Sequence, residues 1–519
     1  MRLTPVVAAI PVAASAFQLP FKLSTLFSTA QAEQVPLYSQ TRPAEPVKPR
    51  IAIIGAGAGG SSAAFWISKA KERSDLDLDS VDVYEKEDWI GGRSTVVYPY
   101  GNNSYPAVEL GASIFISANK NLWRSTDEFN LTRRDFRDES DGMGIWDGNE
   151  MLFTANGGWW SIWDNIKALW RYGFYSPRRA QAVVQEMVAK FLTLYGSETP
   201  KWTNITELSA ALEWEELVAS TTADFFKAQG VSEQFIGELV EASTRVNYGQ
   251  NVDQIHALEG TVSLAPAGAS AVDGGNFQIF EQFLNRSGAN VYLNTPVQSI
   301  TPDGAGNWVI ASSRGSETYT GVILAAPWHS TNIQLPSAIA ESIPKQPYVH
   351  LHVTHLSTTR ATVSPEALGL PPSTKMPAML LTVRKGNAEP EFNSLSYHGK
   401  ISEDEWVVKI FSKGRIEDER LSQLFEGQVG WIHRKEWDAY PVLPPTTTFP
   451  DVKLSPGLYY VNSFEPFIST METETLSSRN IVDLLLQEHF GASICGRKED
   501  DGTDTTKKDA DEYIYGWDC

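Results

Sequence analysis

A run of glycines directly after a short apolar strand constrains this chain more than any other feature. The strand reads IAIIG, and Gly55, Gly57 and Gly60 form the pattern G-x-G-x-x-G at the start of a predicted helix, SSAAFWISKA. In this context the first glycine permits a tight turn, the second lets the backbone approach a pyrophosphate, and the third lets helix and strand pack closely. The pattern predicts a Rossmann-type βαβ unit whose helix N-terminus binds phosphate groups.

A carboxylate follows at the end of the next predicted strand. The segment VDVYEKE reads as this strand, and Glu85 stands at its end. A carboxylate in this position accepts hydrogen bonds from ribose hydroxyl groups, and it favours a ribose with free hydroxyls over one that carries a 2′-phosphate. The strand, the glycines and Glu85 together predict a dinucleotide-binding site.

Two further motifs narrow the class of cofactor. WIGGRS contains Gly92 and Arg93, and AVELGAS contains Gly111 and Ala112. This succession of motifs resembles the FAD-binding proteins of the amine oxidase type. The resemblance implies that Gly92 and Arg93 lie against the pyrophosphate, that Gly111 and Ala112 run beside the flavin, and that FAD rather than NAD is the cofactor.

The same resemblance assigns roles to two later segments. In LNTPVQSI, a strand centred on Val297 is expected to return to the cofactor domain and pair its backbone with the adenine. Near the C-terminus, SFEPFISTMETETLSSRNIV is expected to form a strand-to-helix turn that brings Met471 and Glu472 to the pyrimidine edge or the ribityl chain of the flavin. The alternative for these two residues is an exposed helix start.

The 519 residues suffice for two or three domains. The expected fold class is α/β: a Rossmann-like FAD-binding domain with an interleaved substrate domain that is largely helical with an added β-sheet. We expect a signal peptide at 1–32 (cleavage after 32, or alternatively after 16), a linker at 33–49, the cofactor domain in three parts at 50–155, 241–330 and 455–492, a helical substrate region at 156–240, a substrate domain at 331–454, and a charged C-terminal tail at 493–519.

Charge and the N-terminus bear on partners and compartment. A formal charge of -20 disfavours nucleic acid as a partner. The N-terminus reads as a secretory signal peptide, and no later apolar stretch is long enough to predict a transmembrane segment. We therefore expect the secretory pathway. Four sequons are predicted glycosylation sites: Asn102, Asn130, Asn204 and Asn285.

The cysteine and histidine residues do not form a pattern that predicts a metal site. The two cysteines, Cys495 and Cys519, either pair in a disulfide or remain free or intermolecular thiols. His350, His352 and His355 stand close together, but on a strand the first two share one face while His355 lies on the other. We interpret the histidines as strand packing or surface groups, and we predict no metal centre.

A longer set of strings resembles one family in particular. From about residue 50 to 490, the segments LWRYGFYSPR, STRVNYGQN, VSLAPAG, VDGGN and YYVNSFEPFISTMETE resemble prenylcysteine oxidase, also called prenylcysteine lyase. The resemblance implies a thioether oxidase that cleaves farnesyl- or geranylgeranylcysteine with molecular oxygen, giving prenyl aldehyde, cysteine and hydrogen peroxide. It also implies glycosylation and a lysosomal or vacuolar location, with an extracellular one as the alternative.

The substrate site is less defined by the sequence. Arg245, Asn247, Tyr248 and Gln250 are candidates for polar groups near the flavin, and the alternative is a domain junction held by hydrogen bonds. A prenyl chain needs an apolar channel. Candidate wall residues are Trp159, Trp160, Trp163, Trp170, Tyr172, Phe174 and Tyr175, each of which is alternatively a core residue.

Two other functions remain open from the sequence. The first is a flavin oxidase on the same scaffold that acts on another apolar or aromatic small molecule. The second is a catalytically silent relative that binds a lipid or a protein, although the intact glycine motif argues against it.

Overall fold

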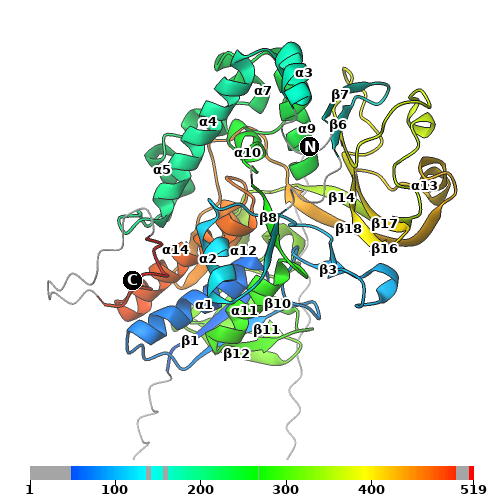
Figure 1. Cartoon of the computed structure of the whole chain (residues 1–519). Coiled ribbons are helices and arrows are strands. Elements are labelled where there is room, and N and C mark those ends of the chain that lie inside the picture. Colours follow the sequence, from blue (N-terminus) through cyan, green and yellow to red (C-terminus); the bar gives the residue numbers. More distant parts are fainter. Residues whose placement is uncertain (1–47, 136–141, 156–161, 267, 498–512) are drawn as a thin grey trace, which may run out of the picture. The chain divides into compact units, whose positions relative to one another are not determined.

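The computed structural model describes residues 48–135, 142–155, 162–266, 268–497 and 513–519 (Figure 1). The predicted signal peptide and the predicted linker up to residue 47 lie outside the described residues. So do Trp159, Trp160 and the side chain of Trp163. None of the helices in the described part is long and apolar enough to cross a membrane.

A six-stranded, mainly parallel sheet forms the base of the cofactor domain (Figure 1). Its strand order is β19-β20-β13-β1-β2-β9, and only β19 runs antiparallel to its neighbour. The strands are β1 (Arg50–Ile54), β2 (Ser80–Tyr84), β9 (Asn290–Tyr292), β13 (Gly321–Leu324), β19 (Lys453–Ser455) and β20 (Leu458–Tyr460). The predicted βαβ unit is therefore the centre of a sheet assembled from three separate parts of the chain.

Alternation along β1 explains the layers on either side of this sheet. Ile51 and Ile53 pack into the core beneath the helices, whereas Ala52 and Ile54 pack against a three-stranded sheet on the opposite face. The helices of the first face are α1 (Ala58–Arg73), α11 (Phe277–Ser287) and α14 (Met471–Phe490). The small sheet consists of β10 (Val297–Pro302), β11 (Trp308–Ser312) and β12 (Gly315–Tyr319).

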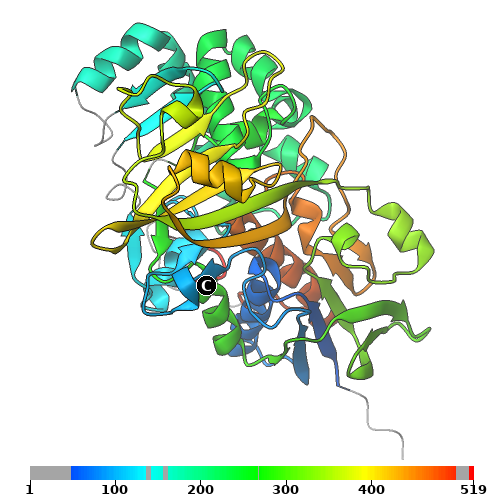
Figure 2. The same ribbon diagram turned by 90° about the vertical axis from the view of Figure 1, so that its right-hand side faces the viewer.

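A second, seven-stranded sheet lies in the other half of the described chain (Figure 2). Its order is β18-β14-β17-β16-β15-β6-β7, with β6 (Met143–Trp146), β7 (Met151–Ala155), β14 (Tyr348–Thr358), β15 (Met379–Thr382), β16 (Ser394–Ser402), β17 (Glu405–Ser412) and β18 (Val429–Pro441). The sequence analysis assigned residues up to 155 to the cofactor domain. In the structure β6 pairs in parallel with β15, so β6 and β7 lie in the second sheet instead.

The region between the two sheets is helical, as its composition predicts. It contains α3 (Ile162–Tyr172), α4 (Tyr175–Leu192), α5 (Ile205–Ala211), α6 (Glu215–Ala219), α7 (Thr222–Ala228), α8 (Glu233–Phe235), α9 (Glu241–Tyr248) and α10 (Ala257–Val262). α9 packs on β15, and α10 packs on α7. These two helices therefore belong structurally to the substrate region, although residues 241–330 were expected in the cofactor domain. The remaining elements are β3 (Val96–Val97), β4 (Val108–Glu109), α2 (Lys120–Glu128), β5 (Arg133–Asp135), β8 (Ser270–Val272), α12 (Ser337–Ser342) and α13 (Asp418–Leu424).

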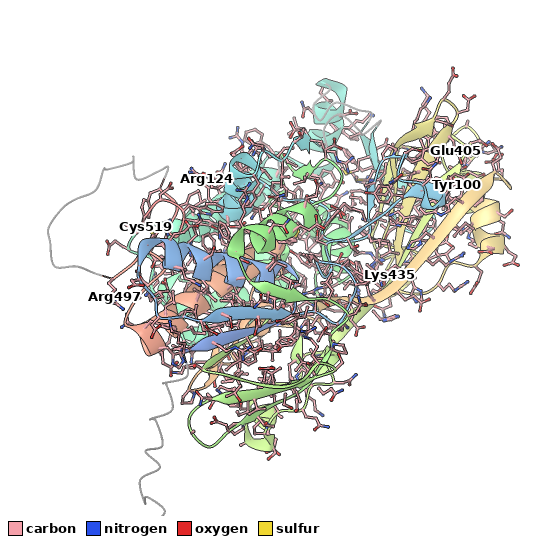
Figure 3. The ribbon with its side chains drawn as sticks, turned by 90° about the horizontal axis from the view of Figure 1, so that it is seen from below. Tyr100, Arg124, Glu405, Lys435, Arg497 and Cys519 are labelled. Carbon is pink, nitrogen blue, oxygen red and sulfur yellow. A yellow bond between two sulfur atoms is a disulfide. The ribbon has the colours of Figure 1, made fainter. Side chains whose placement is uncertain are left out.

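The end of the chain packs back onto the first helix. Cys495 and Cys519 form a disulfide, which answers the alternative left open by the sequence. Trp517 lies against Phe65 and Trp66 of α1, with ring centroids 5.1 and 5.4 Å apart. A surface hollow of about 300 Å³ adjoins Trp517. Figure 3 shows Cys519 on this side of the molecule, while Tyr100 and Glu405, joined by a 2.6 Å hydrogen bond, lie on the opposite side. Of the predicted tail at 493–519, residues 493–497 and 513–519 therefore pack on the cofactor domain, and residues 498–512 lie outside the described residues.

We expect the paired change Cys495→Ser and Cys519→Ser to destabilise the protein. The disulfide spans a sequence separation of 24. Closing a loop of that length restricts the unfolded chain and stabilises the fold by about 3 kcal/mol. Urea unfolding measures the loss. Added reductant should lower the stability of the wild type and leave the double variant unchanged; the same stability in both proteins without reductant would contradict the expectation.

Candidate functional site

The glycine motif forms the turn that the sequence predicts. Gly55 has a φ of +109°, and a Cβ there would lie 2.5 Å from the carbonyl oxygen of Ala325. A Cβ on Gly60 would lie 2.9 Å from the carbonyl carbon of Gly55 and closer still to its oxygen. The first and third glycines are thus required by contacts within the protein: a side chain at Gly55 would strike the backbone that follows β13, and one at Gly60 would strike the end of β1.

Gly57 differs from its neighbours because the protein itself leaves room beside it. It is the N-cap residue of α1 with a φ of -79°, and the nearest atom to an added Cβ is the Cα of Gly92 at 3.7 Å. Backbone N–H groups at the start of a helix, unshielded by a capping side chain, form a cradle for an anion. A glycine at this position therefore suits the approach of a ligand, and the site fits a dinucleotide pyrophosphate.

Glu85 lies beside the glycine loop. Its carboxylate accepts hydrogen bonds from the N–H of Ala56 at 2.7 Å and of Glu87 at 2.9 Å. Burial raises the pKa of Glu85. The N–H of Thr295 donates to the Glu85 carbonyl at 2.7 Å, which brings the start of β10, and with it Val297, to the same end of the sheet. The structure thus brings Gly57, Glu85 and the start of β10 together at one end of the sheet.

The GGR segment lies against the glycine loop. Gly91 and Gly57 form a parallel bridge, and the N–H of Gly91 donates to the carbonyl of Ala56 at 2.9 Å. Arg93 points onward to the interior. Its guanidinium donates to the carboxylate of Glu465 and, at 3.0 Å, to the carbonyl of Ala439. Gly92 therefore borders the predicted phosphate cradle, while the charge of Arg93 is paired with a buried carboxylate.

The AVELGAS segment runs beneath the long strand β18. A Cβ on Gly111 would lie 2.6 Å from the ring of Trp437 and 3.2 Å from the carbonyl oxygen of Arg93. Ala112 has a φ of +47°, which a non-glycine residue rarely adopts, and its carbonyl accepts a 2.8 Å hydrogen bond from Asn276. Gly111 and Ala112 are thus held next to Arg93, where the two domains meet.

Buried carboxylates concentrate at this junction, which the sequence analysis did not foresee. Glu465 accepts hydrogen bonds from Arg93 and from the hydroxyl of Tyr348. Glu474, in the first turn of α14, lies so near the glycine loop that a Cβ on Gly59 would be 3.0 Å from its Oε2. Burial, reinforced by the charge of Glu465, raises the pKa of Glu474 to about 8. The acidic residues in the otherwise apolar string YYVNSFEPFI and the following METE were the available signal.

The junction also holds polar atoms without partners. Within the described residues, Oε1 of Glu474 and Oδ1 of Asn462 are buried and make no hydrogen bond. Leaving such atoms unpaired is costly, so their presence beside the glycine loop indicates a polar ligand. The hydroxyl groups of a ribityl chain are of this kind, and Glu474 and Asn462 are the residues placed to receive them.

Glu472, predicted to approach the flavin, is used differently. Its Oε1 accepts hydrogen bonds from the N–H of Asn121 at 2.9 Å and the hydroxyl of Tyr195 at 2.6 Å, and its Oε2 accepts from the N–H of Leu122 at 2.9 Å. These N–H groups belong to the first turn of α2. Both carboxylate oxygens of Glu472 thus cap a neighbouring helix, and Glu474, two residues later, takes the position facing the glycine loop.

A buried lysine and glutamate lie beside AVELGAS. Lys409 of β17 donates to the hydroxyl of Ser113 at 3.0 Å, and burial lowers the pKa of its ammonium to about 8. Burial raises the pKa of Glu109 to about 7, and Glu109 accepts a 2.6 Å hydrogen bond from the N–H of Asn276. Two groups with pKa values near neutrality can hold or release a proton at physiological pH. A lysine inside the apolar strand EWVVKIF was the sequence signal for this pair.

The TRVNYGQ residues are divided between two settings. Arg245 is fully buried and donates to Asn251 at 2.8 Å and to Glu389 at 2.5 Å. Gln250 accepts from the N–H of Leu443 at 2.8 Å and donates to the carbonyl of Pro441 at 3.0 Å. These contacts correspond to the alternative of a hydrogen-bonded domain junction.

Asn247 and Tyr248 complete this string. Asn247 donates to the carbonyls of Ser243 and Ser263, which ties it to the helical region. Tyr248 alone faces the buried carboxylates: its ring packs on Tyr440, and it lies beside Glu259, whose pKa burial raises to about 8. Of the four candidates, Tyr248 is the one that lies beside a buried carboxyl with a raised pKa, that of Glu259.

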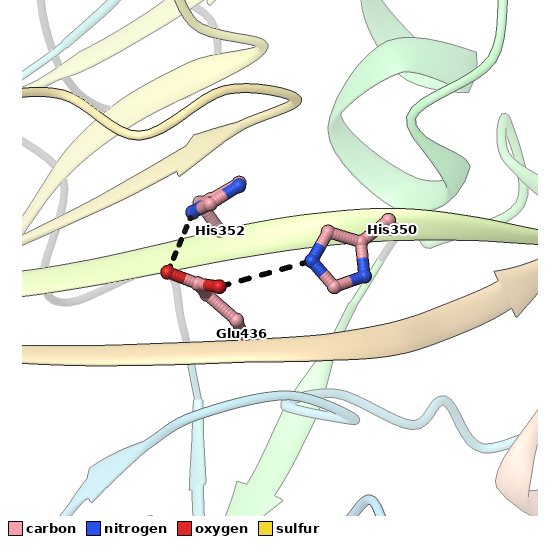
Figure 4. Close-up of side chains that lie close together, drawn as sticks. All are labelled: His350, His352 and Glu436. Atoms are coloured by element: carbon pink, nitrogen blue, oxygen red, sulfur yellow. Dashed lines mark ion pairs between the residues drawn. The ribbon is translucent and has the colours of Figure 1, made fainter.

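The histidines on β14 divide as expected. His350 and His352 lie on one side of the strand, and His355 is buried on the other, bonded through Nε2 to the carbonyl of Glu109. Glu436 faces the first two from β18, with its oxygens 4.0 Å from His350 and 3.3 Å from His352 (Figure 4). Their ligand atoms lie within 4.8 Å of one another on the surface. We describe the three as a surface ion-pair group, and the absence of a metal centre stays a prediction.

Several predicted aromatic channel residues lie on the surface instead. Trp170 is 92% exposed, and Phe174 and Tyr175 are exposed as well. Tyr172 is buried and donates a 2.9 Å hydrogen bond to Glu238. The aromatic side of α3 faces away from the core because its other side is anchored by that contact, so these three rings do not line a buried channel.

The sequons differ in accessibility. Asn102, Asn130 and Asn285 are exposed. Asn204 is the N-cap of α5, and its side chain accepts from the N–H of Thr206 at 2.8 Å. Asn204 is half-buried, so the other three are the more accessible acceptors. Glycosylation itself stays a prediction.

Solved structures identify the class of this fold. Cyclohexylamine oxidase from Brevibacterium oxydans aligns with a TM-score of 0.58 at 14% identity, covering 85% of this chain and 99% of that chain. Wild-type putrescine oxidase bound to putrescine aligns with a TM-score of 0.56 at 14% identity, covering 84% and 99%. Residues 53–129 also match a family of NAD(P)-binding Rossmann-like domains. The protein has the amine oxidase type of fold, built on a Rossmann-like domain.

Comparison of sequences gives the family. The prenylcysteine lyase family matches residues 156–494, more than half of the chain. Farnesylcysteine lyase of Arabidopsis thaliana is 30% identical over 458 residues, covering 84% of this chain and 88% of that protein. Prenylcysteine oxidase 1 of Mus musculus is 29% identical over 478 residues, covering 84% and 89%. The chain belongs to the prenylcysteine lyase family, which confirms the resemblance seen in the sequence.

Glu474→Gln should remove part of the pH dependence of stability. The pKa of Glu474 is about 8 in the folded protein, against 4.5 for an ordinary glutamate. Because the folded state holds its proton longer, stability is lost as pH rises from about 4.5 to 8, by about 1 kcal/mol for each pH unit. The glutamine variant should therefore gain stability relative to wild type between pH 5 and 8, measured by urea unfolding.

Glu341→Gln is the matched control, because Glu341 is exposed on α12. The buried histidines are common to all three proteins and cancel in the comparison. A stability difference between Glu474→Gln and wild type that stays constant from pH 5 to 8 would show that Glu474 is ionised in the folded state.

Proposed function

We propose that this protein is an FAD-dependent oxidase of prenylcysteines. A prenyl thioether, molecular oxygen and water are converted to a prenyl aldehyde, free cysteine and hydrogen peroxide. The C–S bond breaks, the carbon bonded to sulfur is oxidised to the aldehyde, and oxygen is reduced by two electrons. The observation that carries the proposal is the dinucleotide site formed by Gly57, Glu85 and the GG pair at residues 91–92, in a chain of the prenylcysteine lyase family.

The residues that would hold FAD follow from the geometry. Gly57 and the N-terminus of α1 suit the pyrophosphate, Glu85 a ribose, and the backbone near Val297 the adenine. Gly111 and Ala112 lie where the flavin ring is expected. We add Glu474 and Asn462 for the ribityl hydroxyl groups because both carry unpartnered buried oxygens beside the glycine loop.

When bound, FAD supplies the two-electron oxidation and the reaction with oxygen. The chain contributes position, exclusion of water and proton handling. Trp437 and Tyr440 of β18 cover the segment at Gly111. Lys409 and Glu109, with pKa values of about 8 and 7, would hold the proton released when water adds to the substrate, because Lys409 bonds to Ser113 beside the segment at Gly111 and Ala112.

The compartment is part of the proposal. A disulfide between Cys495 and Cys519, a predicted signal peptide and three exposed sequons support folding in the secretory pathway, with a lysosomal or vacuolar destination. Burial raises the pKa of Glu259 and of Glu474 to about 8, and the stability that these protonated carboxyls contribute is present at mildly acidic pH and is lost as pH rises toward 8.

Purified protein should show flavin absorption bands and produce peroxide, prenyl aldehyde and cysteine in equal amounts from farnesylcysteine. S-Methylcysteine, which has the thioether but no prenyl chain, is the matched control and should give no peroxide. Flavin bands without turnover of farnesylcysteine would favour the same-scaffold oxidase of another small molecule. Absence of flavin would contradict both oxidase functions and favour a silent relative.

Gly57→Val should abolish flavin retention while the protein remains folded. The protein leaves room for a side chain at Gly57, so the valine meets the cofactor rather than the chain. Gly414→Val, at an open surface position, is the control and should retain flavin. Flavin absorbance after gel filtration measures retention, and circular dichroism checks the fold. Stoichiometric flavin in Gly57→Val would refute the placement of the pyrophosphate.

A further inference from the structure

Large hydrophobic side chains gather at one place on the surface. Six such side chains are exposed in the described part of the chain, and five of them lie on α3 and the start of α4: Ile166, Leu169, Trp170, Phe174 and Tyr175. We call these five the α3–α4 patch. Figures 1 and 2 show α3 at an extremity of the helical region, far from the six-stranded sheet. Exposed apolar groups that cluster in this way mark a site of interaction.

The exposure is built into the fold rather than left by a frayed helix. Ile166, Leu169 and Trp170 follow the spacing of one helix face. On the other face, Arg171 donates two hydrogen bonds to Glu238 at 2.6 and 2.8 Å, and the hydroxyl of Tyr172 donates to the same carboxylate. These contacts fix the rotation of α3, so the apolar face is held outward.

The start of α4 is fixed in the same way. The hydroxyls of Ser176 and Ser232 are 3.0 Å apart, and Arg179 donates to the carbonyl of Gly230. Phe174 and Tyr175, immediately before these anchors, are therefore held at the surface beside the apolar face of α3.

The charges around the patch are opposite in sign to those of the protein. Residues 162–180 carry four cationic side chains, Lys167, Arg171, Arg178 and Arg179, and one carboxylate, Asp164, giving +3, whereas the whole chain carries -20. Lys167 lies 3.3 Å from the buried carboxylate of Asp164, and Arg171 pairs with Glu238, so Arg178 and Arg179 carry most of the basic charge that this surface presents. The guanidinium of Arg178 lies 3.8 Å from the ring centre of Phe174. Cationic groups thus border the aromatic rings directly.

We propose that the α3–α4 patch docks the protein on lipid bilayers that carry anionic headgroups. A helix with an apolar aromatic face and a basic border lies in the plane of the interface, with Trp, Tyr and Phe at the level of the headgroups and Arg and Lys on the phosphates. The rest of the acidic protein is repelled by an anionic surface. The basic border beside the aromatic rings therefore favours an anionic lipid surface as the partner, with this face turned toward it.

The purpose of this docking rests on the proposed function, although the docking itself does not. A farnesyl or geranylgeranyl chain is stabilised in apolar surroundings by about 0.8 kcal/mol for each buried methylene, so prenylcysteines accumulate in bilayers. An enzyme seated on the bilayer meets its substrate where the substrate is concentrated. The α3–α4 patch then acts in substrate delivery.

The test is flotation of the full, processed protein with vesicles, without substrate. Vesicles of phosphatidylcholine with about one third phosphatidylglycerol should bind the wild type, and pure phosphatidylcholine should bind it more weakly. The paired change Leu169→Ser and Trp170→Ser should reduce partitioning roughly tenfold. Arg178→Gln with Arg179→Gln should remove the preference for the anionic lipid. Tyr100→Ser and Arg314→Gln, at exposed positions elsewhere, are the matched controls and should bind as wild type does.

The docking would be overturned if the wild type did not bind anionic vesicles, or if the protein with Leu169→Ser and Trp170→Ser bound them as well as the wild type does. It would also be overturned if the wild type were a dimer that this double change dissociates, since the patch would then be a protein interface. Circular dichroism and thermal unfolding verify that each variant is folded. Vesicle binding by a protein that releases no peroxide from farnesylcysteine would reject the proposed activity and leave the docking intact.

Discussion

The close contact between Gly60 and the carbonyl of Gly55 is the constraint on which the cofactor domain depends. It presses the first turn of α1 against the end of β1, and so aims the N-terminus of that helix across the edge of the parallel sheet. Every other element of the dinucleotide site is positioned from there: Gly91 pairs beside Gly57, and Glu85 is held by the N–H of Ala56. The phosphate cradle is thus a consequence of backbone packing before any ligand is present.

The ion pair of Arg93 and Glu465 joins this edge to the second domain. Arg93 follows the GG pair, Glu465 precedes α14, and Tyr348 of β14 donates to the same carboxylate. Because a buried charge without its partner is strongly destabilising, this group ties the domains in one relative position. The remaining carboxylates nearby, Glu474 and Glu259, have no such cation of their own, and burial keeps them protonated near neutrality. Apart from the ion pair, the carboxyls of the junction are therefore polar but uncharged near neutrality.

The sequence predicted what depends on local patterns. The βαβ unit, the acidic residue after β2 and the helical middle region all follow from spacing within a few turns, and the structure has each of them. It did not predict that β6 and β7 join the second sheet, because β6 pairs with β15 more than two hundred residues later. The sequence also did not show which of Glu472 and Glu474 faces the glycine loop. The two residues are two positions apart on a helix and point in different directions, so their roles depend on the neighbouring elements: Glu472 caps α2, and Glu474 lies beside the glycine loop. The aromatic residues of α3 posed the same problem, since richness in rings does not tell an inner face from an outer one.

The return of the C-terminus to α1 has a consequence for synthesis. The strand β1 and the helix α1 are completed by β13, β20, α14 and Trp517, all of which follow them by more than two hundred residues. Until then the apolar flanks of β1 and α1 lack their native cover, and the nascent chain exposes them throughout elongation. A chain that stops before Trp517 lacks part of the cover of α1. Such a truncated product is expected to be a substrate for quality control rather than a shortened enzyme.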